Sequence, residues 1–441
     1  MMQATTKSAA GSKKALAVVF LLMALIICLS AARPAHADST FTVNLTGDAP
    51  DAKLDDNACD TKLILIGSQC TLRAAIQEAN DTADPDTINF SIPGDAAYKT
   101  ISPHSALPVI NDEVTIDGYS QPGASPNTLA KGDDAVLKIE LNGTDAGNAA
   151  GLDVRDKSVI RGLVINRFER QGIIIHSEGD RSRVEGNFIG TDPTGMADLG
   201  NDGYGVNITS KFQVSVGGSS PEARNLISGN DRDGVSITGN SYQTLVQGNY
   251  IGTNRNGTGA LGNTWYGVYI AGAAYNHVGS NTIARNKYGG VYINAAGNDF
   301  TNANGNTVTR NSIFSNGDQS NQGIYMGMVP NDPGDADIGP NTLQNKPVVT
   351  SASAFGGQAT IKGRLSSTPE EDFTIEIFSN PSGTDQGKKF LGQRTVSTGS
   401  DGKATFTLTK DVPVGLNITA TATDAAGNTS EFSSPRTVVS S

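Results

Sequence analysis

The sequence predicts an all-β protein: a right-handed parallel β-helix with a short N-terminal capping helix, followed by a small β-sandwich. Three observations predict this fold class. A unit of the form Gly-apolar-x-apolar recurs along the middle of the chain, 51 of the 441 residues are glycine, and only 6% are aromatic. Many glycines between short apolar strands are typical of chains that turn tightly and often.

The first 37 residues predict a secretory signal peptide. Lys13 and Lys14 precede an apolar run over 15–29, and residues 35–37 (Ala-His-Ala) form a small-x-small cleavage site. The run is shorter than a comfortable membrane span, and we expect no membrane span later in the chain. We therefore expect a secreted or cell-surface protein whose mature chain begins at Asp38.

The mature chain is strongly acidic. The whole sequence has 33 basic and 44 acidic residues, a formal net charge of −11, and the signal peptide holds four of the basic and none of the acidic residues, which leaves −15. Nucleic acids and anionic lipids bind basic surfaces, so we expect neither as a partner. Cations and neutral polysaccharides are compatible with this charge.

Internal repetition is the main evidence for a solenoid. Residues 186–208 and 248–270 share Gly-Asn-aromatic-Ile-Gly-Thr, then Leu-Gly-Asn, then Tyr-Gly-Val-x-Ile. The shorter Gly-apolar-x-apolar unit opens at intervals of 33, 29, 33, 23 and 33 residues, at Gly172, Gly205, Gly234, Gly267, Gly290 and Gly323. One coil cannot bury its apolar face alone, so coils stack, and the longer intervals are coils with inserted loops at 191–201 and 253–263.

Asparagines at strand ends predict inward-turning corners, where stacked amides hydrogen-bond along the axis. They include Asn187, Asn249, Asn281 and Asn311. A β-propeller predicts a longer period and a tryptophan or aspartate signature, but the chain has one tryptophan. Regularly spaced leucines, which a leucine-rich repeat requires, are absent from the sequence.

The N-terminal edge of a solenoid needs a cover. Residues 71–80 predict an amphipathic helix, with apolar side chains at Leu72, Ala75, Ile76 and Ala79. Cys59 and Cys70 are the only cysteines of the mature chain, and in an oxidising compartment we expect them to form one disulfide. We predict that this tethered helix covers the first coil.

The pattern changes at about Lys346. Short alternating strands replace the repeats at 359–363, 373–378, 404–408 and 418–423. We therefore predict a solenoid over 38–345, with its cap region at about 41–150, and a β-sandwich over 346–441.

Several segments resemble known bacterial proteins. Residues 70–76 (Cys-Thr-Leu-Arg-Ala-Ala-Ile) are similar to the Cys-Ser-Leu-Arg-Glu-Ala motif of secreted β-helix proteins of the CSLREA type, with Thr71 in place of Ser and Ala74 in place of Glu. Residues 116–123 and the Gly-Thr loops also resemble this group, over about 41–345. Residues 423–430 (Thr-Asp-Ala-Ala-Gly-Asn-Thr-Ser) look like the final strands of bacterial immunoglobulin-like modules. These resemblances imply a secreted or surface protein with an immunoglobulin-like spacer or interaction unit, and no particular reaction.

The middle residue of each Gly-apolar-x-apolar strand is expected to face solvent, because side chains alternate along a strand. Sugar rings pack on exposed aromatic rings, so aromatic residues at these positions predict a carbohydrate-binding face. The middle residues are Ile174, Asn207, Ser236, Tyr269, Tyr292 and Tyr325, with Trp265, Tyr266 and Tyr288 beside them. We predict that Tyr269, Tyr292, Tyr325, Trp265 and Tyr266 bind the ligand. The alternative is that the rings only stabilise the sheet or are covered by a loop.

Two acidic clusters are further candidates. Asp202, Asp231, Arg232 and Asp233 lie before two such strands, where paired carboxylates serve glycoside chemistry or bind calcium. The motifs of polygalacturonase-like hydrolases and alginate epimerases are absent, and solvated turn aspartates are the alternative. The second cluster is the metal candidate, in which Ca²⁺ would bind to Asp332, Asp335 and Asp337. A polar linker is its alternative.

The sequence thus favours a secreted or surface β-helix that binds an extracellular or cell-wall polysaccharide, or acts as an adhesin, without catalysis or a required cofactor. A polysaccharide lyase or glycoside hydrolase that uses the first acidic cluster is the alternative.

Overall fold

The computed structural model describes residues 39–54, 56–62, 69–82, 84–209, 212–297, 299, 301–317 and 323–441. The predicted signal peptide lies outside these residues. In the part of the chain that is described, no helix has the length and apolar character needed to cross a membrane.

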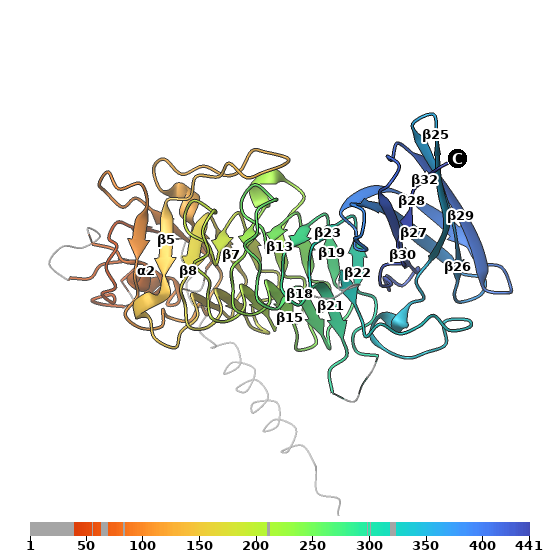
Figure 1. The fold of residues 1–441 in the computed structure, drawn as a ribbon. Helices are drawn as coiled ribbons and strands as arrows, with labels where there is room; N and C mark the ends of the chain where they lie inside the picture. The colour runs from red at the N-terminus through yellow and green to blue at the C-terminus, as the bar shows by residue number, and fades with distance from the viewer. Residues whose placement is uncertain are drawn as a thin grey trace, which may run out of the picture.

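The predicted parallel β-helix is confirmed. The described strands before residue 326 form three parallel sheets along an elongated solenoid (Figure 1), and each coil supplies the sheets in turn. The nine-stranded sheet consists, in spatial order, of β1 (Thr40–Val43), β2 (Asp86–Phe90), β4 (Val114–Asp117), β7 (Ser158–Arg161), β10 (Arg183–Glu185), β13 (Ser215–Gly217), β16 (Leu245–Gln247), β19 (His277–Gly279) and β22 (Thr307–Thr309).

The other two sheets follow the same order along the axis. The eight-stranded sheet consists of β3 (Lys99–Ile101), β5 (Ile139–Asn142), β8 (Leu163–Asn166), β11 (Phe188–Ile189), β14 (Leu226–Ile227), β17 (Tyr250–Ile251), β20 (Thr282–Ala284) and β23 (Ser312–Phe314). The seven-stranded sheet consists of β6 (Leu152–Val154), β9 (Ile173–Ile175), β12 (Val206–Ile208), β15 (Val235–Ile237), β18 (Tyr266–Ala271), β21 (Gly289–Asn294) and β24 (Ile324–Tyr325).

The core of the solenoid is a column of aliphatic side chains. In the seven-stranded sheet Val206 pairs in register with Ile173 and Val235, and all three side chains are fully buried. Equivalent residues of all three sheets join one cluster along the axis. Each coil therefore buries its apolar face against the coils before and after it, as the repeat predicts.

The glycine that opens each repeat unit allows successive coils to approach closely. A Cβ atom on Gly205 would lie 2.6 Å from the carbonyl oxygen of Gly234, and one on Gly234 would lie 2.8 Å from the carbonyl oxygen of Gly267. Any larger residue would push the main chains of neighbouring coils apart. The spacing of these glycines therefore marks the coils.

Buried asparagines form hydrogen-bonded ladders at the corners, which confirms their predicted role. Except at the last member of each ladder, the side-chain amide donates to the Oδ1 atom of the next asparagine and also to a main-chain carbonyl, so the polar groups of the corners are satisfied. Between the nine- and eight-stranded sheets, at 2.9–3.2 Å, the ladder consists of Asn187, Asn225, Asn249, Asn281 and Asn311. Between the eight- and seven-stranded sheets, at 2.9 Å, it consists of Asn201, Asn230, Asn263, Asn286 and Asn316.

The predicted N-terminal cap is helix α2 (Leu72–Ala79), which contacts β1 and β2. The Thr71 hydroxyl accepts a hydrogen bond from the Ala74 amide, so threonine caps the helix. Arg73 forms an ion pair with both carboxylate oxygens of Asp48, each at 2.9 Å. The predicted Cys59–Cys70 disulfide is present, and both of its cysteines belong to the axial core.

The C-terminal part is an antiparallel sandwich of two four-stranded sheets, in the orders β29-β26-β25-β32 and β28-β27-β30-β31. Its strands are β25 (Val348–Phe355), β26 (Gln358–Ser366), β27 (Asp372–Asn380), β28 (Lys389–Ser397), β29 (Lys403–Lys410), β30 (Asn417–Thr423), β31 (Arg436–Thr437) and β32 (Val439–Ser440). The four predicted strands correspond to β26, β27, β29 and β30, whereas β25, β28, β31 and β32 were not predicted. Of residues 423–430, which were expected to form final strands, Thr423 ends β30 and the others turn after it.

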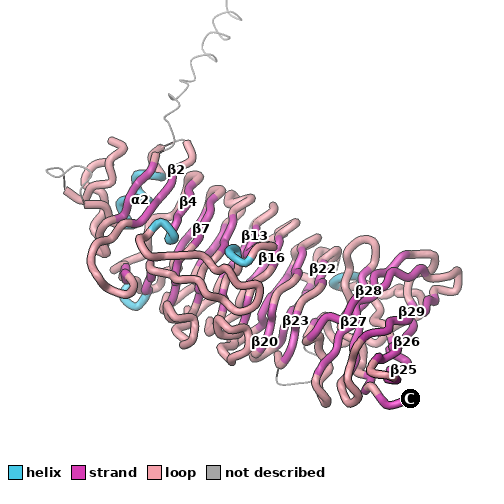
Figure 2. The backbone as a smooth tube through the Cα atoms, turned by 90° about the horizontal axis from the view of Figure 1, so that it is seen from above, coloured by secondary structure: helices cyan, strands magenta, loops and turns pink. Residues whose placement is uncertain are grey.

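The sandwich closes the C-terminal end of the solenoid (Figure 2). One asparagine ladder ends on it, because Asn316 donates to the Gln386 side chain at 3.3 Å and Gln386 donates back to the Asn316 carbonyl at 2.6 Å. Phe378 and Phe432 of the sandwich belong to the axial core cluster. The apolar edge of the last coil is therefore covered by this domain.

The turn after β30 and strand β27 complete this junction. The Thr429 hydroxyl accepts a hydrogen bond from the Val308 amide at 3.0 Å. Glu376 of β27 is buried and accepts hydrogen bonds from the Thr309 hydroxyl and the Arg310 amide. Burial raises the pKa of Glu376 above its ordinary value.

Candidate functional site

Tyr269, Tyr292 and Tyr325, the tyrosine row, lie on three successive coils of the seven-stranded sheet. Tyr269 pairs in register with Tyr292, and Tyr292 with Tyr325. The ring centroids of these pairs are 5.4 and 5.0 Å apart. The sequence places these rings in one line, because the same position of consecutive coils is tyrosine.

The expectation that every middle residue of this sheet faces solvent is only partly correct. The tyrosine row and Asn207 are half-buried, whereas Ile174 is 8% and Ser236 is 1% exposed. Ser236 lies between Asn207 and Tyr269 in the register, so its larger neighbours shield it. Alternation sets the direction of a side chain, but the size of its neighbours sets its exposure.

More aromatic rings lie beside the row. Tyr266 lies 4.8 Å from the Tyr292 ring and 6.3 Å from the Tyr269 ring, measured between centroids. Trp265 and Tyr288 stack at 6.4 Å, with their planes 9° apart. Burial raises the pKa of Tyr266 to about 12, so its phenol stays protonated at neutral pH. This surface therefore offers both ring faces and hydroxyl groups to a ligand.

Arg232 and Asp233 lie at the edge of this aromatic surface. The Arg232 guanidinium lies 5.1 Å from the Trp265 ring and 5.4 Å from the Tyr204 ring. Asp233 is 1% exposed, and its Oδ1 atom accepts a hydrogen bond from the Tyr266 amide at 2.8 Å. The buried Oδ2 atom of Asp233 has no hydrogen-bond partner among the described residues. Burial raises the pKa of this carboxyl to about 7, although the Tyr266 amide and Arg232 act in the opposite direction.

The predicted acid–base residues differ in accessibility. Asp202 and Asp231 follow ladder asparagines on successive coils, and both are exposed, whereas Asp233 is buried below the main chain of the next coil. Burial and, to a smaller extent, the like charge of Asp231 raise the pKa of Asp198, so Asp231 lies near another turn aspartate. Two solvated turn aspartates therefore surround one buried carboxyl. This differs from a glycosidase site, in which two carboxylates flank the bound sugar.

The three predicted metal ligands do come together. Asp332, Asp335 and Asp337, the three-aspartate cluster, each place one carboxylate oxygen within 4.8 Å of the others. Asp335 accepts hydrogen bonds from the Asn345 amide at 2.8 Å and the Ser367 hydroxyl at 2.6 Å. Burial raises the pKa of Asp335 to about 6. Oxygen ligands of this kind suit Ca²⁺, but clusters of carboxylates are common without a metal, so the calcium site stays a prediction.

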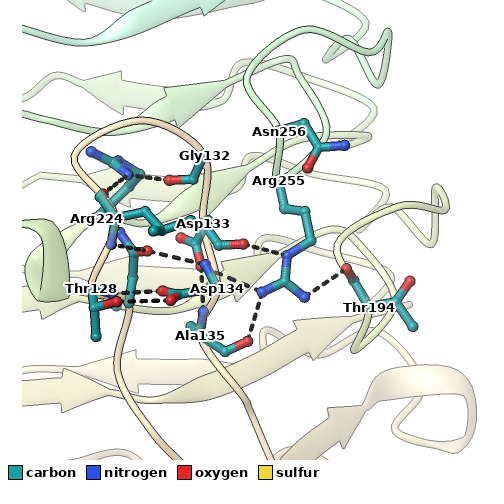
Figure 3. Close-up of polar contacts among 12 residues, drawn as sticks. Thr128, Gly132, Asp133, Asp134, Ala135, Thr194, Arg224, Arg255 and Asn256 are labelled. Carbon is teal, nitrogen blue, oxygen red and sulfur yellow. Dashed lines mark hydrogen bonds and ion pairs between the residues drawn. The ribbon is translucent and has the colours of Figure 1, made fainter.

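Residues 121–138, the strap, lie across the eight-stranded sheet and were not predicted. Figure 3 shows the polar contacts that hold the strap. Arg224 donates to the carbonyl oxygens of Leu129 and Ala130 at 2.9 and 3.0 Å. Arg255 donates to those of Asp133 and Ala135 at 2.6 and 2.8 Å. Two arginines of the solenoid thus fix the main chain of the strap at several points.

The strap covers an apolar row on the outer face of that sheet. Ala135 and Leu137 pack against four residues that are aligned coil by coil: Val164, Phe188, Leu226 and Tyr250. The strap reaches as far as Tyr250, whose hydroxyl accepts a hydrogen bond from the Gly132 amide at 2.7 Å. Beyond Tyr250 the same row continues with the polar residues Thr282 and Ser312.

The fold and these surfaces define a parallel β-helix that is capped at both ends and carries an aromatic face on one sheet. Comparison with known protein families finds no family that matches the chain, and no curated protein matches it significantly.

Proposed function

We propose that this protein is secreted or displayed at the cell surface and binds an extracellular or cell-wall polysaccharide on the tyrosine row, without catalysis. One observation carries the proposal: three tyrosines lie in register on adjacent coils, with ring centroids 5.4 and 5.0 Å apart. Two coil steps extend over about 10 Å, since neighbouring strands lie about 4.8 Å apart. A rigid aromatic strip of this length can contact more than one sugar ring of a chain.

Other features support the same role. The predicted signal peptide and the disulfide fit an oxidising extracellular compartment. The resemblance of residues 70–76 to secreted CSLREA-type proteins, and of residues 423–430 to bacterial immunoglobulin-like modules, fits an adhesin or surface protein. The sandwich would then serve as both the cap of the solenoid and an interaction unit.

The test is affinity electrophoresis of the purified protein through gels that contain single neutral or acidic polysaccharides. We expect at least one polysaccharide to retard the wild type and to lose this effect on the Tyr269→Ala/Tyr292→Ala/Tyr325→Ala triple variant. The matched control removes three aromatic rings that contact one another at the corner between the seven- and nine-stranded sheets, in Phe212→Ala/Tyr242→Ala/Tyr275→Ala. Equal retardation of the wild type and the tyrosine-row variant would refute the proposed site.

The alternative function, a polysaccharide lyase or glycoside hydrolase, has one observation in its favour. The Asp233 carboxyl has a pKa of about 7, which suits a general acid. However, Asp233 is only 1% exposed, so a sugar reaches it only if the segment around Tyr266 moves. The assay is depolymerisation of polysaccharides by the wild type, measured with and without calcium. If the wild type were active and Asp233→Asn were not, our ranking of the two functions would be reversed.

A further inference from the structure

A groove of about 600 Å³ opens beyond Tyr250, where the strap no longer covers the eight-stranded sheet. Its floor continues the outer row of the eight-stranded sheet, with Tyr250, Thr282 and Ser312. One wall is formed by Lys131, at the turn midway along the strap, and by residues 256–258 of an inserted loop. The opposite wall belongs to the sandwich. The groove therefore depends on the docking of the sandwich onto the solenoid.

The sandwich wall is held in place by contacts with the last coil. The Ser312 hydroxyl donates to the carbonyl oxygen of Lys388 at 2.6 Å. The Lys388 ammonium lies 4.8 Å from the centre of the Phe314 ring. Lys389 and Phe390 follow at the start of β28 and also line the groove. Rigid main chain on both sides thus positions the side chains that face the opening.

The groove is basic, although the protein is acidic. Lys131, Lys388 and Lys389 line it, and its described lining contains no carboxylate. All three lysines are exposed, and none forms an ion pair within 4.0 Å among the described residues. A groove with three ammonium groups on a chain of net charge −11 is a local exception to the surface charge. It is electrostatically suited to an anionic ligand.

The rest of the lining is that of a sugar site. Two half-buried aromatic rings, from Phe314 and Phe390, contribute apolar surface, and the edge of the largely covered Tyr250 ring closes the floor. Hydroxyl and amide groups are also present, at Asn256, Thr258 and Thr282. Pockets of roughly this volume hold ligands of a few ring units. A nucleic acid would require basic surface well beyond the groove, because it presents a charge at every phosphate.

We propose that this groove binds a short segment of a uronate-containing polysaccharide, with its carboxylates on the lysines and its rings on Phe314 and Phe390. The site lies on a different sheet from the tyrosine row and does not depend on it. The protein then holds an acidic polymer at the junction of its two domains, in addition to any glycan on the tyrosine row.

The test is isothermal titration of the purified full chain with hexameric oligogalacturonate, a neutral hexasaccharide and a single-stranded oligonucleotide. We expect oligogalacturonate to bind, and Lys388→Ala/Lys389→Ala to weaken the binding about tenfold, since exposed ion pairs each contribute only modestly. Added salt should weaken the binding further. The matched control is Lys362→Ala/Lys410→Ala, which removes the same charge from exposed positions of the sandwich outside the groove.

We expect the control variant and the tyrosine-row triple variant to bind oligogalacturonate as the wild type does, which separates this site from the proposed glycan surface. Four results would overturn the proposal: no binding by the wild type, equal binding by the groove variant, equal binding of the neutral sugar, or equal binding of the oligonucleotide.

Discussion

The asparagine ladders should be a principal source of stability, and Asn249→Ala tests this most sharply. Asn249 is fully buried in the middle of its ladder. Its amide donates to the carbonyl oxygen of Val216 at 2.8 Å and to Asn281 at 3.0 Å. Its Oδ1 atom accepts from the side chain and the main chain of Asn225 at 2.9 and 3.2 Å. Alanine removes these four bonds and a fifth, from the same amide to the Gln247 carbonyl at 3.1 Å, and leaves their partners buried.

The expected cost follows from the groups left without partners. A buried donor or acceptor without a hydrogen bond costs about 1–3 kcal/mol. At least two such groups remain, the Val216 carbonyl and the Asn225 main-chain amide, so we expect Asn249→Ala to lower the free energy of unfolding by about 3–5 kcal/mol. This is a large part of the roughly 5–15 kcal/mol that stabilises a typical domain.

The assay is urea denaturation followed by circular dichroism. Asn207→Ala is the matched control, because Asn207 lies on the outer face of a neighbouring sheet and is half-buried. We expect the control to change the free energy of unfolding by about 0.5 kcal/mol or less. If the two variants unfolded at the same urea concentration, the ladder would contribute little to stability and our reasoning would be wrong.

Three further predictions concern other parts of the chain. Asp233 has a folded pKa of about 7, above the unfolded value near 3.8, so its contribution to stability is present below pH 4 and is lost as the pH rises through 7. Asp233→Asn should therefore gain stability relative to the wild type between pH 4 and 8, on the order of a few kcal/mol, and parallel pH profiles from urea titrations would contradict this. Breaking the Cys59–Cys70 disulfide by Cys59→Ser should cost about 3 kcal/mol, and an unchanged melting temperature would show that the cap does not depend on it. If the three-aspartate cluster binds calcium, millimolar CaCl₂ should raise the melting temperature of the wild type and not that of Asp335→Asn, whereas equal shifts would exclude the site.

The solenoid could be predicted from the sequence because each coil requires particular residue types at the same few positions. Gly205 and Gly234 lie where a Cβ atom would meet the next coil, and Asn187 and Asn249 occupy corners that need an amide. Such residues recur once per coil, so the spacing reveals the period. The register of the tyrosine row follows directly from it.

The strap and the junction could not be predicted in the same way, because they depend on contacts between distant residues. Arg224 bonds to a carbonyl 95 residues away and Arg255 to one 120 residues away, through main-chain atoms that carry no sequence signal. One signal was present: Phe188 and Tyr250 are apolar at outward-facing positions directly before a buried isoleucine. Apolar side chains at such positions are expected to be covered by another segment of the chain. The pattern does not indicate which segment that is. Strand β28 was missed because its residues do not alternate clearly between apolar and polar.

A glycan array probed with the wild type, the tyrosine-row triple variant and the Phe212/Tyr242/Tyr275 control tests the proposed function most directly. We expect the wild type and the control to bind the same set of polysaccharides, and the tyrosine-row variant to lose the signal for at least part of that set. If all three proteins gave the same signals, or if the wild type bound no glycan, the aromatic face of the seven-stranded sheet would not be a polysaccharide-binding surface.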